Sequence, residues 1–376
     1  MNGNKKKIIF IIRDFSFGGI NTVTGQVATY LSSLKSFDII IISLSKRNGQ
    51  AKEKFPKNNN TSIYYFDEFV DGYLGVLSRM LNYIVPFIGT ILLSSLFSRL
   101  LLTKIKKIDN VSKVYLCGFG VYSNFLKIKD NNYYFVSHNI KSKLLKKRCG
   151  FFYNMNRKWL CSNIINKNLL LVSSAIKNDW VNNITQGFMK DAEVIYNPIN
   201  IEKNKKMSDE YKIPYDNYFV YCGRLEKEKN VDKIINAWNA SGVKSKLVIV
   251  GDGTQLGYLK EIANCINPEN IIFVGRVSNP YPYIKNARGL ILFSDFEGLP
   301  TVALEAIGLG VNLIINECGG AAYDVIQEEF YNNIINGLDT NLLAKQILIA
   351  ERSDQFVYPF ENNKYDIKSV AMKYVR

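Results

Sequence analysis

Two glutamates at the start of one predicted helix are the most informative residues of this sequence. Residues Phe296 to Glu305 read FEGLPTVALE, so Glu297 and Glu305 stand eight positions apart. A buried-strand pattern, Gly289 to Asp295, precedes them, and an apolar helical pattern follows. Because ligands of parallel α/β sheets bind where a strand ends and a helix begins, both carboxylates are candidates for ligand binding.

A second candidate site lies in the stretch YCGRLEKEKN, Tyr221 to Asn230, where a predicted strand ends in a glycine turn. Arg224 and Lys229 follow that turn and precede a predicted helix. A guanidinium fork and a mobile ammonium beyond a strand end suit two adjacent phosphates. The alternative is a surface loop in which these cations pair with Glu226 and Glu228.

Glycines recur at other predicted strand ends. Gly251 follows one strand, and Gly275 in the segment Phe273 to Val277 follows another. Such glycines let the backbone approach a flat ring or a ribose closely, although tight-turn chemistry alone also explains them. Near the amino terminus, Gly18 and Gly19 follow the first strand and could bring backbone N–H groups to a diphosphate. The G-x-G-x-x-G pattern is not satisfied, so a NAD site is not supported.

The sequence has one histidine, His138, and it closes the predicted strand that begins at Tyr133. A lone histidine is often a hydrogen-bonded core residue. This one stands at a strand's carboxyl end, as the other candidates do, and that position favours a place in the site.

The elements that position these residues alternate between short apolar runs and longer helical patterns, which is typical of parallel α/β sheets. A polar, charged stretch after Asn197 to Asn200 is the best domain boundary. The predicted domains are residues 1–200, residues 201–355 and a C-terminal segment, 356–376, that could cross back to the first domain. Strands are predicted at Lys7–Arg13, Asp38–Ser43, Ser62–Phe66, Lys113–Cys117, Tyr133–Ser137, Leu169–Ser173, Glu193–Tyr196, Tyr218–Cys222, Lys246–Val250, Ile271–Val274, Gly289–Phe293 and Val311–Ile315.

Charge is divided unevenly between the two halves. Residues 1–200 hold 28 Lys and Arg against 11 Asp and Glu, whereas residues 201–376 hold 20 against 22. The basic first half suits nucleic acid, an anionic membrane or an acidic substrate, or it is a solvated lysine-rich surface. Six scattered cysteines and one histidine provide no zinc-binding pattern, so reduced thiols in the cytoplasm and no metal are expected.

The apolar segment Tyr83 to Leu102 departs from the α/β pattern because it is nearly long enough to span a bilayer, at about 20 residues. Pro86 and Arg99 interrupt it, and strands of the same domain are predicted on both sides of it. We therefore expect a helix docked at the membrane interface with the help of Lys104 to Lys107, or an ordinary core helix.

The motifs around Gly19, His138, Arg224, Gly251 and Glu297, taken together and in this order along the chain, resemble those of family 4 glycosyltransferases. The resemblance covers almost the whole chain and is most specific from Tyr218 to Gly320. It implies the GT-B fold, in which the parallel sheets of two Rossmann-like domains face an interdomain cleft. It also implies retaining transfer from a nucleotide-activated sugar. Asp324 stands where family members often carry a glutamate, and its role is open.

The resemblance also implies roles for individual residues. Arg224, Lys229 and Gly19 would hold the donor diphosphate, and Glu297 and His138 would lie nearest the reacting carbon as catalytic residues. Glu305 would bind the ribose. The neighbours of these residues would complete the donor site, with Gly298 and Leu299 at the sugar and ribose and Gly251, Arg276 and Val277 at the base.

Breaking a sugar–diphosphate bond leaves negative charge on the departing oxygens, so the site needs cations and N–H donors there. The helix that opens near Thr301 would supply unpaired amides. No Asp-x-Asp occurs in the sequence. Charge neutralisation by Arg224, Lys229 and that helix end, without a metal or other cofactor, is therefore expected. A glycosidase would place both carboxylates across one bond, and for both glutamates we favour hydroxyl binding over proton transfer.

We therefore predict a glycosyltransferase that adds a hexose or N-acetylhexosamine to a lipid-linked or oligosaccharide acceptor in cell-surface polysaccharide synthesis, of O-antigen, lipopolysaccharide or capsule type. Its partners would be a nucleotide-diphosphate sugar, the glycan acceptor and an anionic inner-membrane surface, and not nucleic acid. It would be cytoplasmic and peripheral on the inner face of the cytoplasmic membrane. The first domain would bind the acceptor and the second the donor.

Two alternatives stay open at this point. A GT-B nucleotide-sugar epimerase would isomerise the donor sugar without any acceptor. A non-catalytic basic module that binds lipid or nucleic acid would explain the charged first half, but it gives Glu297 and Glu305 no purpose. The sequence does not specify the base, the sugar or the linkage.

Overall fold

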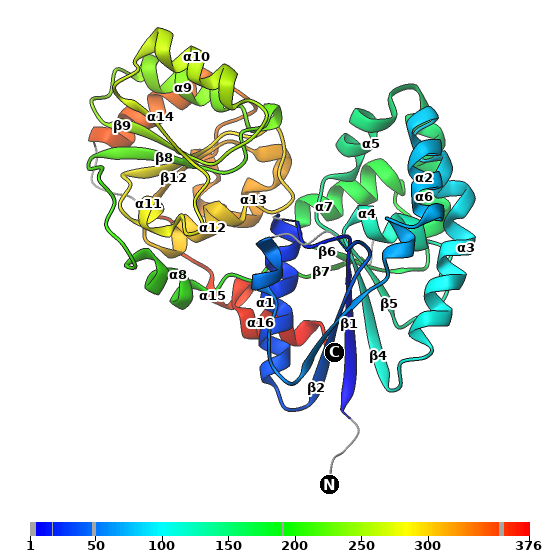
Figure 1. The fold of residues 1–376 in the computed structure, drawn as a ribbon. Coiled ribbons are helices and arrows are strands. Elements are labelled where there is room, and N and C mark those ends of the chain that lie inside the picture. Colours follow the sequence, from blue (N-terminus) through cyan, green and yellow to red (C-terminus); the bar gives the residue numbers. More distant parts are fainter. Residues whose placement is uncertain (1–4, 17, 47–49, 190–191, 353–356) are drawn as a thin grey trace. The chain divides into compact units, whose positions relative to one another are not determined.

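The computed structural model describes residues 5–16, 18–46, 50–189, 192–352 and 357–376. Contacts within the chain define two compact units (Figure 1). Unit 1 comprises Met1–Pro198 and Asn363–Arg376, and unit 2 comprises Ile199–Asn362. The chain leaves unit 1 at the AsnProIleAsn segment, and the C-terminal residues that contact unit 1 begin at 363 rather than at the expected 356.

Unit 1 is built on a seven-stranded parallel sheet in the order β3-β2-β1-β4-β5-β6-β7. Its central strands are continuous apolar runs because helices cover both faces of the sheet. All seven predicted strands are confirmed, with ends that differ by two residues at most. The strands are β1 (Lys6–Ile12), β2 (Phe37–Ser43), β3 (Thr61–Tyr65), β4 (Val111–Cys117), β5 (Tyr133–Ser137), β6 (Asn168–Leu171) and β7 (Glu193–Val194).

The C-terminal helix α16 (Ile367–Lys373) packs beside α1 (Gly19–Ser33) in unit 1 (Figure 1). The Tyr115 hydroxyl on β4 donates to the Tyr374 carbonyl, and the two rings lie 4.9 Å apart. Both tyrosines are buried, so the last residues of the chain help to close the core of unit 1. The remaining helices of unit 1 are α2 (Tyr73–Ile84), α3 (Ile88–Ile105), α4 (Phe119–Tyr122), α5 (Lys141–Cys149), α6 (Tyr153–Ile164) and α7 (Ser174–Asp179).

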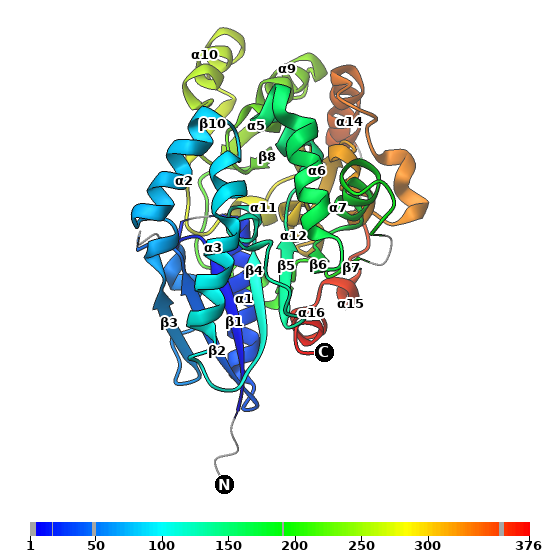
Figure 2. The same ribbon diagram turned by 90° about the vertical axis from the view of Figure 1, so that its right-hand side faces the viewer.

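The predicted single helix over residues 83–102 is wrong. The chain ends α2 at Ile84, turns through Val85–Phe87 and starts α3 at Ile88, because Pro86 cannot continue a helix and Phe87 adopts a left-handed conformation. Figure 2 looks onto the face of unit 1 that carries α2, α3 and α6. Among the described residues, α3 is the one helix long and apolar enough to cross a membrane by length and composition, a test that core helices also pass.

Unit 2 is a five-stranded parallel sheet in the order β10-β9-β8-β11-β12. All five predicted strands are confirmed. In both sheets the first strand of the unit lies in the middle, with the second and third strands on one side and the fourth and later strands on the other, as in Rossmann-like domains. The strands are β8 (Tyr218–Cys222), β9 (Lys246–Val250), β10 (Ile271–Gly275), β11 (Gly289–Leu292) and β12 (Asn312–Ile315). The helices are α8 (Ile201–Ser208), α9 (Val231–Ser241), α10 (Leu256–Ile266), α11 (Tyr281–Lys285), α12 (Thr301–Gly308), α13 (Ala322–Val325) and α14 (Thr340–Arg352). Helix α15 (Asn362–Tyr365) begins at the last residue of unit 2 and continues in unit 1.

Glycines join the carboxyl ends of three neighbouring strands of unit 2. The Gly223 amide donates to Val250, and the Gly251 amide donates to Gly275. Gly251 has φ 146°, and a Cβ atom placed on it would lie 1.8 Å from the Gly223 carbonyl oxygen. Only glycine fits there, so tight backbone packing explains this glycine whatever its ligand.

We expect Gly251→Ala to lower the free energy of unfolding by about 3 kcal/mol, because the new Cβ meets backbone and the φ value is strained. Gly257→Ala is the matched control. Gly257 lies in α10 with open space around it, so alanine should stabilise by about 1 kcal/mol. Urea unfolding measures both changes, and equal effects would contradict the packing described here.

Candidate active site

An ion pair between two loops is the centre of the unit 2 site. Lys229 Nζ lies 2.6 Å from Glu297 Oε1, and the two side chains are 13% and 15% exposed. Lys229 follows β8 and Glu297 follows β11, strands that are neighbours in the sheet. The sequence therefore placed a phosphate-binding and a sugar-binding candidate at the same sheet edge, and the structure brings them into contact.

Besides the ion pair, one backbone bond and one side-chain bond hold these loops together. The Asp295 amide donates to the Glu228 carbonyl at 2.9 Å, and Asn230 Nδ2 donates to Asp295 Oδ1 at 2.8 Å. Asn230 adopts a left-handed conformation, φ 47°, which an asparagine tolerates better than most residues. The alternative in which Glu226 and Glu228 pair with the loop cations is wrong for Lys229. Glu226 instead accepts hydrogen bonds from Thr254.

Glu297 is oriented by neighbours that sequence reasoning missed. Ser294 Oγ donates to Glu297 Oε1 at 2.9 Å, and the Glu297 amide donates to the Cys318 carbonyl. The buried Asn316 side chain exchanges two hydrogen bonds with the Ser294 backbone, which fixes the end of β11 against the end of β12. A buried asparagine directly after a predicted strand was the one sequence signal that could have indicated this contact.

Arg224 is exposed on the same turn as Lys229. Its carbonyl accepts a hydrogen bond from the buried Tyr221 hydroxyl at 2.8 Å, which fixes the backbone of the turn. Within the part of the chain that the structure describes, no acidic side chain forms an ion pair with the Arg224 guanidinium. This cation is therefore available to an anionic ligand.

Glu305 lies inside α12, one turn beyond Thr301, and is bound from the side by α11. The Tyr281 hydroxyl donates to Glu305 Oε1 at 3.2 Å. Burial, together with the negative charge of Glu305, raises the pKa of the Cys222 thiol at the end of β8 to about 12. Cys222 is therefore neutral at physiological pH.

The remaining predicted residues of unit 2 stand at the same sheet edge. Gly298 and Leu299 form the turn before α12, and Leu299 is buried, so only its backbone could face a ligand. Thr301 is the first residue of α12, whose N-cap Pro300 provides no side-chain cap. Arg276, which is exposed, and Val277, which is half-buried, follow β10, next to Gly251 after β9.

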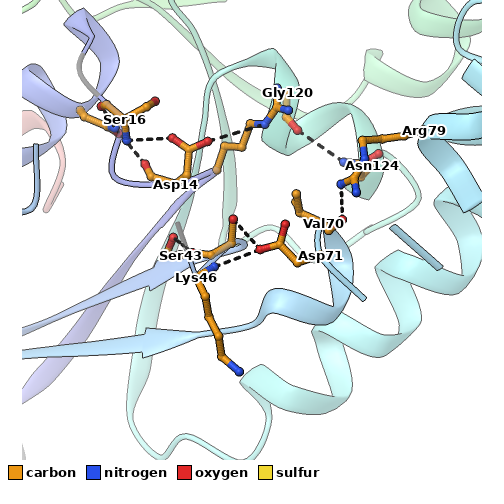
Figure 3. A network of polar contacts seen from close by, with 12 residues as sticks. Asp14, Ser16, Ser43, Lys46, Val70, Asp71, Arg79, Gly120 and Asn124 are labelled. Atoms are coloured by element: carbon orange, nitrogen blue, oxygen red, sulfur yellow. Dashed lines mark hydrogen bonds and ion pairs between the residues drawn. The ribbon is translucent and has the colours of Figure 1, made fainter. Parts of the chain in front are cut away.

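In unit 1, Gly19 is the first residue of α1, exposed and with open space around it. The loop before it is closed by Asp14, whose Oδ1 accepts the Ser16 amide at 2.8 Å (Figure 3). Asn21 Nδ2 donates to the carbonyls of Asp14 and Ser16. These bonds hold the start of α1 at the carboxyl end of β1.

His138 directly follows β5, and its Nε2 atom is buried without a hydrogen-bond partner among the described residues. Burial, with a smaller contribution from the Lys141 charge, lowers the pKa of His138 to about 4. The imidazole is therefore neutral at pH 7, and a buried polar atom without a partner is a place where a ligand group can bind.

Lys141 is a buried cation that sequence reasoning missed. It belongs to α5, whose other basic residues are exposed, but it is 1% exposed, with Nζ 3.7 Å from the centroid of the Phe119 ring. Burial lowers its pKa well below the usual value for lysine. Asp179 accepts the backbone amides of Lys141 and Ser142 and so caps α5.

The structure thus brings Lys229 and Glu297 into contact and sets the other unit 2 candidates along one sheet edge, while Gly19 and His138 stand at the corresponding edge of unit 1. That the two sheets face a common cleft stays a prediction. Among the described residues, no group of three or more His, Cys, Asp and Glu side chains could hold a metal ion.

Comparison with known proteins relates unit 2 to one family of enzymes. Residues 202–365 match the family model described as glycosyl transferases group 1. The chain is 24% identical over 60% of its length to a Campylobacter jejuni N-acetylgalactosamine-N,N'-diacetylbacillosaminyl-diphospho-undecaprenol 4-alpha-N-acetylgalactosaminyltransferase. It is 30% identical over 42% of its length to a Salmonella typhimurium lipopolysaccharide 1,6-galactosyltransferase. The matches span 64% and 45% of these relatives' own lengths.

The whole chain is similar in fold to a solved Anabaena protein, HepE, in a complex with UDP and glucose. The TM-score is 0.68 at 14% sequence identity, with 98% of each chain covered. The predicted GT-B class, with two parallel-sheet domains, is confirmed by this likeness.

The lowered pKa of His138 predicts a pH dependence of stability. The unfolded chain binds a proton near pH 6.5 and the folded chain only near pH 4, so stability is lost as pH falls through this window. We expect unit 1 of the wild type to lose about 2.5 kcal/mol between pH 7 and 4.5 through this residue.

His138→Gln removes the titrating group, so the free energy of unfolding of this variant should fall by about 2.5 kcal/mol less than that of the wild type over the same pH interval. Urea unfolding of both proteins at fixed ionic strength measures the difference. Identical losses in the two proteins would show that His138 is not held neutral by its surroundings.

Proposed function

We propose that the protein is an enzyme that transfers a sugar from a nucleotide-diphosphate donor to a glycan acceptor, because residues 202–365 match the family model described as glycosyl transferases group 1. The observation that carries the proposal is the Lys229–Glu297 ion pair beside the exposed Arg224. Two cations, Arg224 and Lys229, and one carboxylate, Glu297, therefore stand at one edge of the sheet.

The charges of unit 2 suit a donor of this kind. A diphosphate would bind the Arg224 guanidinium and the two remaining donors of the Lys229 ammonium, while Glu297 Oε2 would accept from the sugar hydroxyls. The uncapped amides at the start of α12, near Thr301, would add N–H donors to the phosphates. The structure of HepE, which is similar in fold, contains UDP and glucose, so a UDP-sugar is the first donor to test.

Cleavage of the sugar–phosphate bond would then be promoted by fixed positive charge. Negative charge grows on the departing diphosphate as positive character develops at the anomeric carbon. Arg224 and Lys229 would stabilise the former, and the neutral His138 could hydrogen-bond the sugar without adding a repelling charge. We propose retention of anomeric configuration and independence of metals and other cofactors.

For the acceptor we propose a lipid-linked glycan of O-antigen, capsule or lipopolysaccharide type. The matched Campylobacter protein carries diphospho-undecaprenol in its name and the matched Salmonella protein carries lipopolysaccharide. Unit 1, whose excess of lysine and arginine suits the phosphates of a lipid-linked glycan, would bind this acceptor. The enzyme would work in the cytoplasm, at the inner face of the cytoplasmic membrane.

We expect Arg224→Met and Lys229→Met each to lower kcat/KM for sugar transfer by about 100-fold or more, because each removes a charge that the departing diphosphate needs. A radiolabelled nucleotide-sugar donor with a short-chain polyprenyl-diphosphate glycan acceptor measures the rate. Lys227→Met is the matched control. Lys227 is exposed and two positions from Lys229, so its rate should stay within about twofold.

Lys229→Met also leaves Glu297 without its partner, which could lower activity through stability alone. The double variant Lys229→Met/Glu297→Gln removes both charges and should regain stability without regaining activity. Wild-type rates in Arg224→Met or Lys229→Met, or isomerisation of the donor sugar with no acceptor present, would overturn the proposal.

A further inference from the structure

Helix α2 buries a face of small residues and exposes a face of large apolar residues to solvent. Its buried residues are Gly75 and Ser78, whereas Tyr73, Met80 and Tyr83 are 81%, 63% and 93% exposed. These three stand seven and three positions apart, on one face of the helix. A helix of a soluble domain normally turns that face to the core, so the exposed face indicates an interaction surface.

The small residues have a packing reason. A Cβ atom on Gly89, the second residue of α3, would lie 2.3 Å from the Ser78 carbonyl oxygen, so α2 and α3 touch through their backbones. Leu92, on the outer side of α3 near this contact, is 62% exposed. The two helices therefore pair tightly while their bulky apolar side chains stay outside.

A second exposed apolar segment lies beside the turn between α2 and α3. Phe151, in the turn between α5 and α6, is 97% exposed. The buried Asn156 amide donates to the carbonyl of Pro86 at 3.3 Å and to that of Phe152 at 3.0 Å. One side chain thus holds the two turns together. We call the resulting surface the apolar tip, and it consists of Met80, Tyr83, Ile84, Phe151 and Met155.

The two chain segments that carry the apolar tip are basic. Residues 72–108 contain five Lys and Arg and residues 131–178 contain nine, and neither segment contains Asp or Glu. Helix α5, which leads into Phe151, exposes Lys146 and Arg148. Arg79 on α2 donates to the Val70 carbonyl (Figure 3). Lys146 and Arg148 stand in the last turn of α5, directly before Phe151.

We propose that the apolar tip and the basic α5 dock unit 1 onto the surface of an anionic bilayer. Aromatic and aliphatic side chains would enter the boundary between headgroups and acyl chains, and the lysines and arginines would meet lipid phosphates. This combination favours an anionic bilayer as the partner, since exposed apolar side chains beside a basic helix complement a negatively charged apolar boundary.

The docking surface shares only Tyr83 and Ile84 with the one predicted over residues 83–102. Helix α3 packs one face into the core, where the Phe97 ring centroid lies 5.6 Å from that of Phe69 and Phe97 is 1% exposed. Only the start of α3 adjoins the apolar tip. The inference does not depend on sugar transfer, although it fits a lipid-linked acceptor.

Cosedimentation of the full chain with vesicles tests the proposal without donor or acceptor. We expect the wild type to bind vesicles containing phosphatidylglycerol at least about tenfold more tightly than vesicles of phosphatidylcholine alone, with binding that weakens as salt screens the charges. Tyr83→Ser/Phe151→Ser should weaken binding about tenfold. Lys146→Gln/Arg148→Gln should weaken it about fivefold for each charge removed.

Tyr258→Ser is the matched control, because Tyr258 is a 51% exposed tyrosine on α10 of unit 2. It should bind as the wild type does, and unchanged thermal unfolding should show that every variant is folded. Wild-type binding by Tyr83→Ser/Phe151→Ser, or no binding of the wild type to phosphatidylglycerol, would overturn the proposal. A protein dimer that the same double substitution dissociates would assign the apolar tip to a second copy of the chain.

Discussion

The ion pair between Lys229 and Glu297 is the interaction on which the unit 2 site depends. A mostly buried charge whose partner is lost costs about 3 kcal/mol or more, so the loops after β8 and β11 are held in one arrangement. The same two residues are the proposed ligands of a diphosphate and of sugar hydroxyls. Structural order and ligand binding therefore share one pair of side chains, and Arg224 remains exposed beside it.

Strand positions were readable from the sequence because both sheets are buried on their two faces. Runs such as Ile8 to Ile12 are continuously apolar, and a glycine or polar residue ends each of them. The candidate residues of unit 2 could be found for the same reason, since carboxyl ends of parallel strands meet at one edge. The direct contact of Lys229 with Glu297 could not, because two loops 68 residues apart set it.

Other features had little or no sequence signal. Lys141 stands in a run of surface lysines, and its burial follows from Phe119 on another element, which no local pattern indicates. The break at Pro86 was visible as a proline. That the large residues of α2 point outward was not, because a helical pattern gives the spacing of apolar residues and not the side on which the core lies.

The two units differ in charge. Unit 1 is basic, whereas unit 2 holds 16 Lys and Arg against 21 Asp and Glu and is acidic. We propose that unit 1 binds the membrane and the acceptor and that unit 2 binds the donor. The most direct test of the central claim is the thermal unfolding of the wild type with UDP-, GDP- and ADP-sugars, each in large excess. We expect one nucleotide to raise the unfolding temperature and to stabilise the protein by about 2.7 kcal/mol at one hundred times its Kd. An unfolding temperature that none of these nucleotide sugars changes would contradict the donor site assigned to Arg224, Lys229 and Glu297.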